Sequence, residues 1–449
     1  MLSFLASLIL AQNTPTPPPQ QEIVQPQEVR PLPGELNSIP LFNSNSPEVV
    51  LTEGILLSTF PSENKVHAEA HLDYAFQGRF NIFTHHIARA EDPEDPRTLY
   101  MGILLHNPTT EPATVDVFSA ASYLSQPDAP FIRLPSQVPN PRGDVYSGPG
   151  SRVMSDIIRD RRSETFPSQL VIPPGESRML LNIPIPVEGL EPPLNGRSTY
   201  VELRTDSPIY VASLAKFTED GNKPSLEQWE QILQTGDVAK PRDRAPTPPD
   251  STTGSFIYGR VAGVSKGTEW NARLTSPNED FLRLPDPGEP ISYAISTLQR
   301  GMLGTGQVQS APMLVRYPDT AYFAHGNYGL EYNLNLPLYN PTNETKTVTL
   351  SLQTPIKQDE LDGGLRFLQP PAPQVFFRGT VQLKYRDDAG IPRTRYYHLV
   401  QQRGQMGEPL VTLNIEPQQH RFVSVNFLYP PDATPPQVLT VRALDPSQR

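Results

Sequence analysis

Apolar residues along this chain come in short runs in which they alternate with polar residues, and turn-forming residues separate the runs. The segments TYVELRTDSPIYVASLAKF (residues 199–217) and QVLTVRALD (437–445) show this alternation. A period of two places successive side chains on opposite faces of a strand, so that one face can be buried. Many short strands with frequent turn signals predict a mainly β protein, built from antiparallel, immunoglobulin-like β-sandwiches with a few short helices.

Two pairs of similar segments indicate an internal duplication. LLHNPTTEPATVDV (residues 104–117) aligns with PLYNPTNETKTVTL (337–350), and VIPPGESRMLLNIPI (171–185) aligns with NIEPQQHRFVSVNFL (414–428) in the same order. Each first segment reads as a strand, a polar Asn-Pro-Thr turn and a second strand, because Asn caps turns and Pro presets the backbone that follows it. We therefore expect two related β-sandwich domains.

The spacing of prolines divides the chain. A chain of 449 residues is too long for one hydrophobic core, since such cores stop growing at roughly 250–300 residues. Two Pro-rich stretches without a hydrophobic period indicate extended connectors. The expected plan is a signal peptide (1–11), a Pro-rich disordered tether (12–38), a first β-sandwich domain with extra strands and a short helix (39–239), a Pro-rich linker (240–253) and a second β-sandwich domain (254–449).

The signal peptide is expected from the apolar run LSFLASLILA at residues 2–11, which stops at Gln12 before polar, Pro-rich sequence. Its length suits the apolar region of a leader and is too short to cross a bilayer as a helix. The run lacks the basic residues that usually precede it, and a buried N-terminal strand is the alternative. No later stretch reaches transmembrane length, so we expect no transmembrane segment in the mature chain and a location in the periplasm or at the cell surface.

Helical signals are few. Ser225 and Gln228 match a capping box, and Trp229, Ile232 and Leu233 follow at helical spacing before a glycine. A second short helix is expected over residues 151–162.

Composition excludes several classes of function. The chain has no cysteine, so disulfides, thiolate nucleophiles and Cys-based metal sites are impossible. Its net charge of −11 disfavours nucleic acid as a partner, because phosphate backbones reward clustered Lys and Arg. Nothing matches a nucleotide-binding loop, a nucleophile elbow or a zinc-protease motif, so a non-enzymatic role is favoured.

One constellation suggests a divalent metal as cofactor. If residues 67–73 form a strand, His67, Glu69, His71 and Asp73 share one face. Imidazoles with carboxylates suit zinc, manganese or iron, and His85 or His86 on a neighbouring strand could complete the site. The alternative is the solvated polar face of an edge strand.

Two further features have plain alternatives. The acidic loop at residues 90–97 suits calcium by its oxygen ligands but lacks an EF-hand pattern, which favours a solvated loop. The aromatic residues of the second half suit either glycan binding or core filling. They are Trp270, Tyr317, Tyr322, Phe323 and Tyr328.

The chain also resembles an uncharacterised family of exported cyanobacterial proteins that contain a domain of unknown function. The resemblance implies a cell-envelope setting and brings no activity, cofactor or catalytic residue. The segments that carry it are FNSNSPEVVLTEGILLSTFP (42–61), GRFNIFTHHIARAEDPEDPRTLY (78–100), AASYLSQPDAPFI (120–132), GPGSRVMSDII (148–158), VIPPGESRMLLNIPIPVEGLEPPLNGRSTY (171–200) and PRDRAPTPPD (241–250).

These observations favour a non-enzymatic exported envelope protein, a scaffold or adhesion module whose partners are envelope proteins or glycans. The alternative is a metal-dependent binder or hydrolase of cell-wall polysaccharide centred on the segment from His67 to Asp73. A purely structural partner of other envelope proteins is a third class. Fold alone does not decide among them, since β-sandwiches host many unrelated functions.

Overall fold

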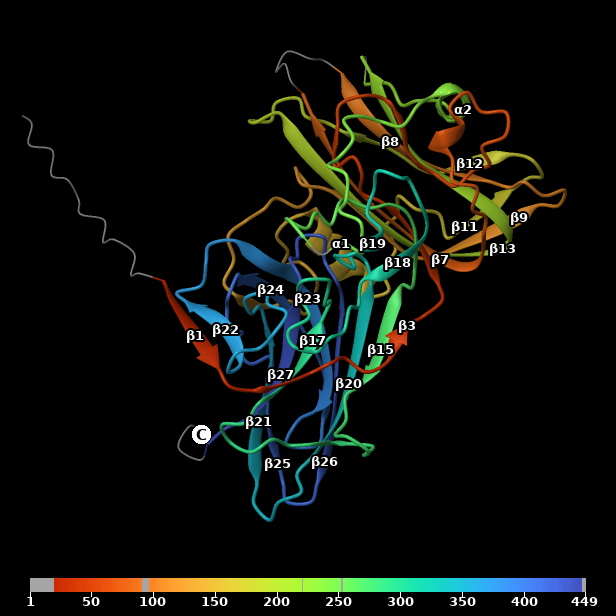
Figure 1. Cartoon of the computed structure of the whole chain (residues 1–449). Coiled ribbons are helices and arrows are strands. Elements are labelled where there is room, and N and C mark those ends of the chain that lie inside the picture. Colours follow the sequence, from red (N-terminus) through yellow and green to blue (C-terminus); the bar gives the residue numbers. More distant parts are fainter. Residues whose placement is uncertain (1–19, 91–96, 220, 252, 446–449) are drawn as a thin grey trace, which may run out of the picture.

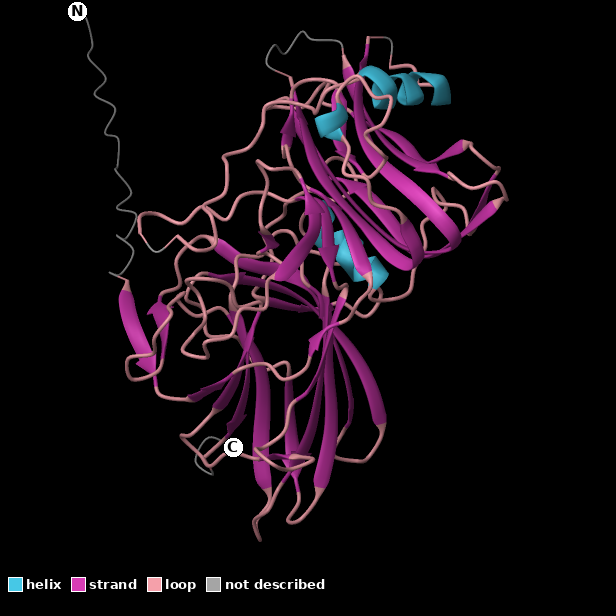
Figure 2. Cartoon of the chain, turned by 45° about the vertical axis from the view of Figure 1, so that its right-hand side comes forward, coloured by secondary structure: helices cyan, strands magenta, loops and turns pink. Residues whose placement is uncertain are grey.

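The computed structural model describes residues 20–90, 97–219, 221–251 and 253–445. It is mainly β, with 47% strand and 5% helix, as the alternating pattern predicts. The strands form two lobes, one above the other in Figure 1, with the second lobe carrying the C-terminal strands. Figure 2 shows that the few helices lie outside the sheets.

The first lobe contains a twelve-stranded sheet assembly whose main path runs β11-β9-β13-β7-β4-β14-β18-β19. Its strands are β4 (Pro40–Ser44), β5 (Val49–Val50), β6 (Gly54–Ser58), β7 (Phe76–Arg89), β8 (Thr98–His106), β9 (Ala113–Leu124), β11 (Gln169–Ile172), β12 (Ser177–Ile185), β13 (Leu194–Thr218), β14 (Ala262–Lys266), β18 (Ala311–Arg316) and β19 (Phe323–Ala324). β13 pairs with β7 and β9 along its first half and with β6 and β8 along its second half. The register shifts between Thr205 and Ile209, so this one strand serves both layers around the core.

The second lobe packs an eight-stranded sheet, ordered β10-β24-β23-β26-β20-β15-β3 with β16 on β20, against a five-stranded sheet, ordered β2-β17-β27-β21-β25. The larger sheet contains β3 (Glu35–Leu36), β10 (Gln137–Pro139), β15 (Glu269–Arg273), β16 (Leu282–Arg283), β20 (Glu331–Tyr339), β23 (Val375–Arg386), β24 (Pro392–Gln402) and β26 (His420–Leu428). The smaller contains β2 (Glu28–Arg30), β17 (Ile291–Ile295), β21 (Lys346–Gln353), β25 (Val411–Ile415) and β27 (Gln437–Ala443). β1 (Gln21–Gln25) and β22 (Leu365–Gln369) form a separate pair. Alternate residues of β20, such as Leu334 and Leu336, meet Val348 and Leu350 of β21 in the core between the sheets.

The sheets are mixed, which differs from the antiparallel sheets expected from the sequence. β4 and β5 run parallel to β7, β15 and β16 run parallel to β20, and β2 runs parallel to β17. Long connections separate these partners in the chain, so no tight turn forces the antiparallel direction.

The N-terminal segment differs from the expected disordered tether. Residues 12–19 lie outside the described residues, but from residue 20 onward the chain forms β1, β2 and β3 along edges of the second lobe. Leu32 lies in the core of that lobe with 1% of its surface exposed. The strands are only two to five residues long, with prolines between them, which explains why no period is visible in the sequence. Exposed sheet edges supply the hydrogen-bond partners that these short strands lack in isolation.

The two lobes exchange strands, so they do not coincide with the expected ranges 39–239 and 254–449. β10 comes from the first half of the chain and pairs with β24 of the second lobe. β14, β18 and β19 come from the second half and extend the sheet of the first lobe beyond β4. The linker expected at 240–253 packs on the molecule through Arg242, whose guanidinium makes an ion pair with Asp319 at 2.7 Å.

The first Asn-Pro-Thr turn is held by its asparagine. The side-chain amide of Asn107 donates to the carbonyl oxygens of Glu111, at 2.7 Å, and Ile172, at 3.0 Å. Its side-chain oxygen accepts from the backbone amide of Thr109 at 2.9 Å. The asparagine therefore ties the turn between β8 and β9 to the end of β11.

The second Asn-Pro-Thr turn has the same bonds. The amide of Asn340 donates to the carbonyls of Glu344, at 2.8 Å, and Ile415, at 2.7 Å. Its oxygen accepts from the amide of Thr342 at 3.1 Å. The strands around the turns also pair alike, since β12 pairs with β8 and β11 with β9, as β26 pairs with β20 and β25 with β21. An internal duplication would explain why the turn bonds and the strand pairing correspond. The duplication itself stays a prediction.

The α-helices lie at two different places. α2 (Leu226–Thr235) begins at Ser225, and Ser225 and Gln228 form the expected capping box. It covers the outer layer of the first lobe with Trp229, Ile232 and Leu233. α1 (Pro149–Ile157) begins two residues before the expected start and ends five residues before the expected end at 162. Its buried face joins Phe83 and Tyr200 of the first lobe to Leu428 of the second, so α1 lies at the junction between the lobes.

Candidate functional site

The segment that contains the expected metal ligands is a turn and not a strand. Residues Ala68–Ala70 form a short 3-10 helix, η1, in which the amide of Ala70 donates to the carbonyl of His67 at 3.0 Å. The period of two therefore fails, and His67, Glu69, His71 and Asp73 do not share a face. Asp73 has a φ of 49°, in the left-handed region, which takes it further from extended geometry.

His71 is a core histidine. It is 7% exposed, and its Nδ1 lies 2.8 Å from the hydroxyl oxygen of Ser58. Burial lowers the pKa of His71 to about 4, and the nearby charge of Lys65 lowers it further. His71 is not part of the group that His67 and Glu69 form, and its neutral ring bonds to Ser58 in the first lobe.

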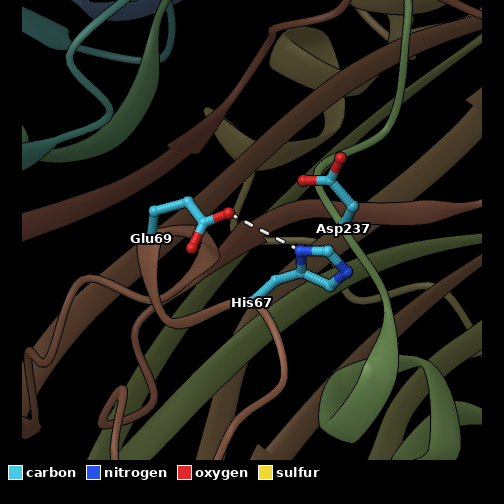
Figure 3. A group of neighbouring side chains, drawn as sticks. All are labelled: His67, Glu69 and Asp237. Carbon is cyan, nitrogen blue, oxygen red and sulfur yellow. Dashed lines mark ion pairs between the residues drawn. The ribbon is translucent and has the colours of Figure 1, made fainter.

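His67 and Glu69 do lie together, and Asp237 from the loop after α2 joins them (Figure 3). One ligand atom from each of the three residues lies within 4.8 Å of the others, and His67 Nδ1 is 3.5 Å from a Glu69 carboxylate oxygen. An imidazole and two carboxylates suit a divalent cation and leave coordination positions for water. Asp237 also makes an ion pair with Lys240 at 3.0 Å, which competes with a metal for that carboxylate.

The neighbouring histidines do not complete this group. His85 Nδ1 lies 2.8 Å from the hydroxyl oxygen of Ser198. His86 is fully buried between the Ser44 hydroxyl and the Pro47 carbonyl, at 2.9 and 2.8 Å. Burial lowers the pKa of His85 to about 4 and that of His86 to about 3, so both rings are neutral structural groups.

The structure describes only part of the acidic loop, and it places several of the aromatic residues of the second half in the core. Residues 91–96 of the acidic loop lie outside the described residues. Trp270 and Tyr317 are 6% and 2% exposed and fill the cores of the two lobes. The guanidinium of Arg316 lies over the ring of Tyr322 in a cation–π contact, 3.8 Å from the ring centroid.

A second candidate site, which we name the junction pocket, lies between the lobes. It has a volume of about 220 Å³ and is partly open to solvent. The first lobe contributes Asn43 of β4 and Asn45, and the second contributes Lys357, which follows β21. Tyr258 and His325, from the segments before β14 and after β19, also bring polar groups to the wall. Further polar lining residues are Arg260, Asn327 and Thr434.

Three side chains of the junction pocket each contain one buried polar atom without a hydrogen-bond partner. Asn43, Asn45 and His325 are 2%, 5% and 8% exposed. The side-chain oxygens of both asparagines and Nδ1 of His325 have no partner among the described residues. A buried polar atom without a partner costs about 1–3 kcal/mol. Three of the twenty such atoms among the described residues belong to side chains that line this one cavity.

The chain positions these groups firmly. Asn43 and Asn45 are two residues apart, so they point to the same face of the extended segment that β4 begins. The backbone amide of Asn45 donates to the carbonyl of Val261 at 2.8 Å. β4 itself is held between β7 and β14. β4 therefore fixes the side of the pocket that carries Asn43, whereas Tyr258, His325 and Lys357 lie in connections between strands.

Lys357, Tyr258 and His325 interact across the pocket wall. The Lys357 ammonium donates to the Tyr258 hydroxyl, which in turn donates to the carbonyl of Gln299 at 2.6 Å. The rings of Tyr258 and His325 meet edge to face with centroids 4.8 Å apart. Burial lowers the pKa of Lys357 to about 8, against the opposing influence of Asp359.

The same environment keeps His325 uncharged. Burial lowers the pKa of His325 to about 4, and the positive charge of Lys357 lowers it further. At neutral pH Asn43, Asn45, His325 and Lys357 therefore present two amides, a neutral imidazole and one ammonium group, and Asn327 and Arg260 add an amide and a guanidinium to the wall.

Sequence reasoning missed the junction pocket because its residues come from six separate segments of the chain. One signal was visible. In FNSNSP (residues 42–47), two asparagines alternate within a segment that otherwise behaves as a strand. Asparagine is depleted in strands, so this alternation indicated a special role for one face. Asp237 gave no such signal, since it is 170 residues from His67.

Comparisons with known proteins place the chain in a family but assign no activity. Within the described residues, no helix combines the length and apolar character that crossing a membrane requires. A comparison with curated proteins gives no match. The model of one protein family matches residues 27–443, which span both lobes and the junction pocket. The chain therefore belongs to the family described as Protein of unknown function (DUF3370).

Proposed function

We propose that this chain is a non-enzymatic, exported binding module of the cell envelope, which holds a small polar ligand in the junction pocket. The observation that carries the proposal is that three buried side chains around one cavity each have a polar atom without a partner: Oδ1 of Asn43, Oδ1 of Asn45 and Nδ1 of His325. Natural proteins satisfy nearly all buried polar groups, and a ligand that bonds to these groups removes the cost of burying them.

The position of the pocket suits a scaffold or adhesion protein. Strand exchange through β10, β14 and β18, together with α1, fixes the two lobes against each other. A ligand that contacts both lobes adds its binding free energy to that arrangement, because binding to the folded state alone stabilises it. Occupancy of the pocket therefore links a small molecule to the geometry of the faces that meet partner proteins or glycans.

Export is supported by the apolar run at residues 2–11 and the absence of cysteine, and the resemblance described above agrees with it. Cell fractionation with N-terminal sequencing of the recovered protein tests this part of the proposal. We expect recovery with envelope material and a start after residue 11. Recovery of protein with an intact N-terminus from the cytosol contradicts export.

The binding part is tested with a panel of neutral sugars, sugar acids, amino acids and hydroxy acids. We expect at least one compound to bind the full chain and raise its melting temperature. Asn45→Leu should abolish that binding, because it removes a lining amide while keeping the side-chain volume close. Asn222→Leu changes an exposed asparagine and is the matched control. Binding that survives Asn45→Leu, or a panel without any binder, contradicts the proposal.

A second candidate function is metal-dependent binding or hydrolysis of cell-wall polysaccharide. The observation that favours it is the grouping of His67, Glu69 and Asp237 within 4.8 Å. Calorimetric titration with zinc or manganese should then give one site that His67→Ala removes. His420→Ala, at an exposed histidine of the second lobe, is the control. The absence of stoichiometric binding eliminates this candidate.

A further inference from the structure

The positive charge in the wall of the junction pocket favours a ligand that carries an anionic group. Arg260 is neutralised, since it makes ion pairs with Glu48 and with Asp243, the latter at 3.4 Å. Lys357 makes no ion pair among the described residues. The charge of Asp359 raises its pKa, and the charge of Arg300 lowers it. Its ammonium uses one of three N–H groups, in the bond to Tyr258. An ammonium held in a pocket wall without a counter-ion attracts an anionic group.

The remaining polar groups suit hydroxyls. Each asparagine side chain offers a carbonyl acceptor and an amide donor, and a hydroxyl can both donate and accept. Nδ1 of His325, in a neutral ring, adds one more donor or acceptor. Asn43 and Asn45 lie side by side on one strand face, so two neighbouring hydroxyls of one ligand can meet them.

The apolar part of the wall and the size of the cavity complete the description. Val261, Leu298 and the ring of Tyr328 also line the pocket. The hydroxyl of Tyr328 is already bonded to the carbonyl of Ala433 at 3.0 Å, so its ring offers an apolar surface. The volume of about 220 Å³ corresponds to roughly seven water molecules at ~30 Å³ each. A space of this size matches one sugar ring.

We propose that the junction pocket binds a sugar acid, with its carboxylate on Lys357 and its ring hydroxyls on Asn43 and Asn45. This inference rests on the proposed binding function and names the ligand class for the same site. The apolar carbons of the ring lie against Val261 and Tyr328. A uronic acid at the end of an envelope glycan and a free sugar acid share this chemistry.

Calorimetric titration of the full chain with D-glucuronate and with D-glucose tests the inference. The two sugars share the ring and differ in the carboxylate. We expect glucuronate to bind at least tenfold more tightly than glucose at pH 7. Equal affinity, or no binding of glucuronate, overturns the sugar-acid assignment. The binding function fails separately, if no compound of the wider panel binds in a manner that Asn45→Leu removes.

Lys357→Met separates the role of the charge from that of the fold. It keeps the length of the side chain, and we expect it to weaken glucuronate binding at least tenfold while leaving glucose unchanged. Lys223→Met, at an exposed lysine, should change neither. A Lys357→Met protein that keeps the melting temperature of the wild type and its glucuronate affinity also overturns the assignment. A glucuronate-capped oligosaccharide then distinguishes a glycan end from the free acid by its relative affinity.

Discussion

Two pairs of asparagines in this protein are buried and differ in the hydrogen bonds of their side-chain oxygens. Asn107 and Asn340 are fully buried, and each holds a turn through its whole side chain. Asn43 and Asn45 are 2% and 5% exposed, and their side-chain oxygens have no partner. The side chains of the first pair find their hydrogen-bond partners within the protein. The side-chain oxygens of the second pair find none there and remain available to a ligand.

The difference teaches that burial alone does not reveal the role of a polar residue. A satisfied buried amide contributes about 1 kcal/mol per bond and fixes one geometry. An unsatisfied one lowers stability, and it persists where function requires it. If the two pairs belong to these opposite classes, a substitution at the turns should cost stability that a substitution at the pocket does not.

The largest effect is expected at the turns. Asn107→Leu leaves the carbonyl of Ile172 and the amide of Thr109 without their partner. We expect a loss of about 3 kcal/mol in the free energy of unfolding, because buried backbone groups then lack hydrogen bonds. Urea denaturation measures it. Asn340→Leu should lower the free energy of unfolding by a similar amount. A loss below about 1 kcal/mol in both variants contradicts a structural role for the turn asparagines.

A second effect extends the comparison to a charged group between the lobes. Glu331 of β20 lies near Glu202 of β13 and Glu269 of β15, and burial with these neighbours raises its pKa from 4.5 to about 7. The folded state then binds the proton more tightly than the unfolded state. The stability linked to Glu331 is present at low pH and is lost as the pH rises from about 4.5 through 7.

Glu331→Gln removes this charge. We expect the variant to be more stable than the wild type by about 2 kcal/mol at pH 8 and equally stable at pH 4. Thermal unfolding across that range checks the prediction. A constant difference between the two proteins at every pH contradicts the assigned cause.

The smallest effect is expected at the pocket itself. Asn43→Leu and Asn45→Leu each remove a buried acceptor that has no partner. Replacing it by an apolar group of similar volume should raise the free energy of unfolding by up to about 1 kcal/mol, so that the variant is slightly more stable than the wild type. Urea denaturation without ligand measures this. A loss as large as that of Asn107→Leu shows that these asparagines are structural.

Local chemistry in the sequence was predictable, and long-range pairing was not. The alternation of apolar residues gave the mainly β class, and the spacing of Ser225 and Gln228 gave the cap of α2. The polar turns at Asn107 and Asn340 were also visible, because they depend on residues close in the chain.

The parallel pairs and the exchange of strands depend on contacts between distant segments, which no local pattern encodes. The same limit applies to the candidate sites. Alternation placed His67 and Glu69 correctly as neighbours but put His71 with them, because it assumed a strand where η1 forms. The junction pocket needed the fold, since Asn45 and Lys357 are brought together only by the meeting of the two lobes.

The central claim is that the junction pocket is a ligand site and the polar turns are not. Side-chain amide NMR signals of the asparagines, assigned by substitution, test it directly when the ligand panel is added. The account predicts that a binder shifts the signals of Asn43 and Asn45 and leaves those of Asn107 and Asn340 unchanged. A panel that shifts neither pocket signal, or that shifts all four alike, contradicts it.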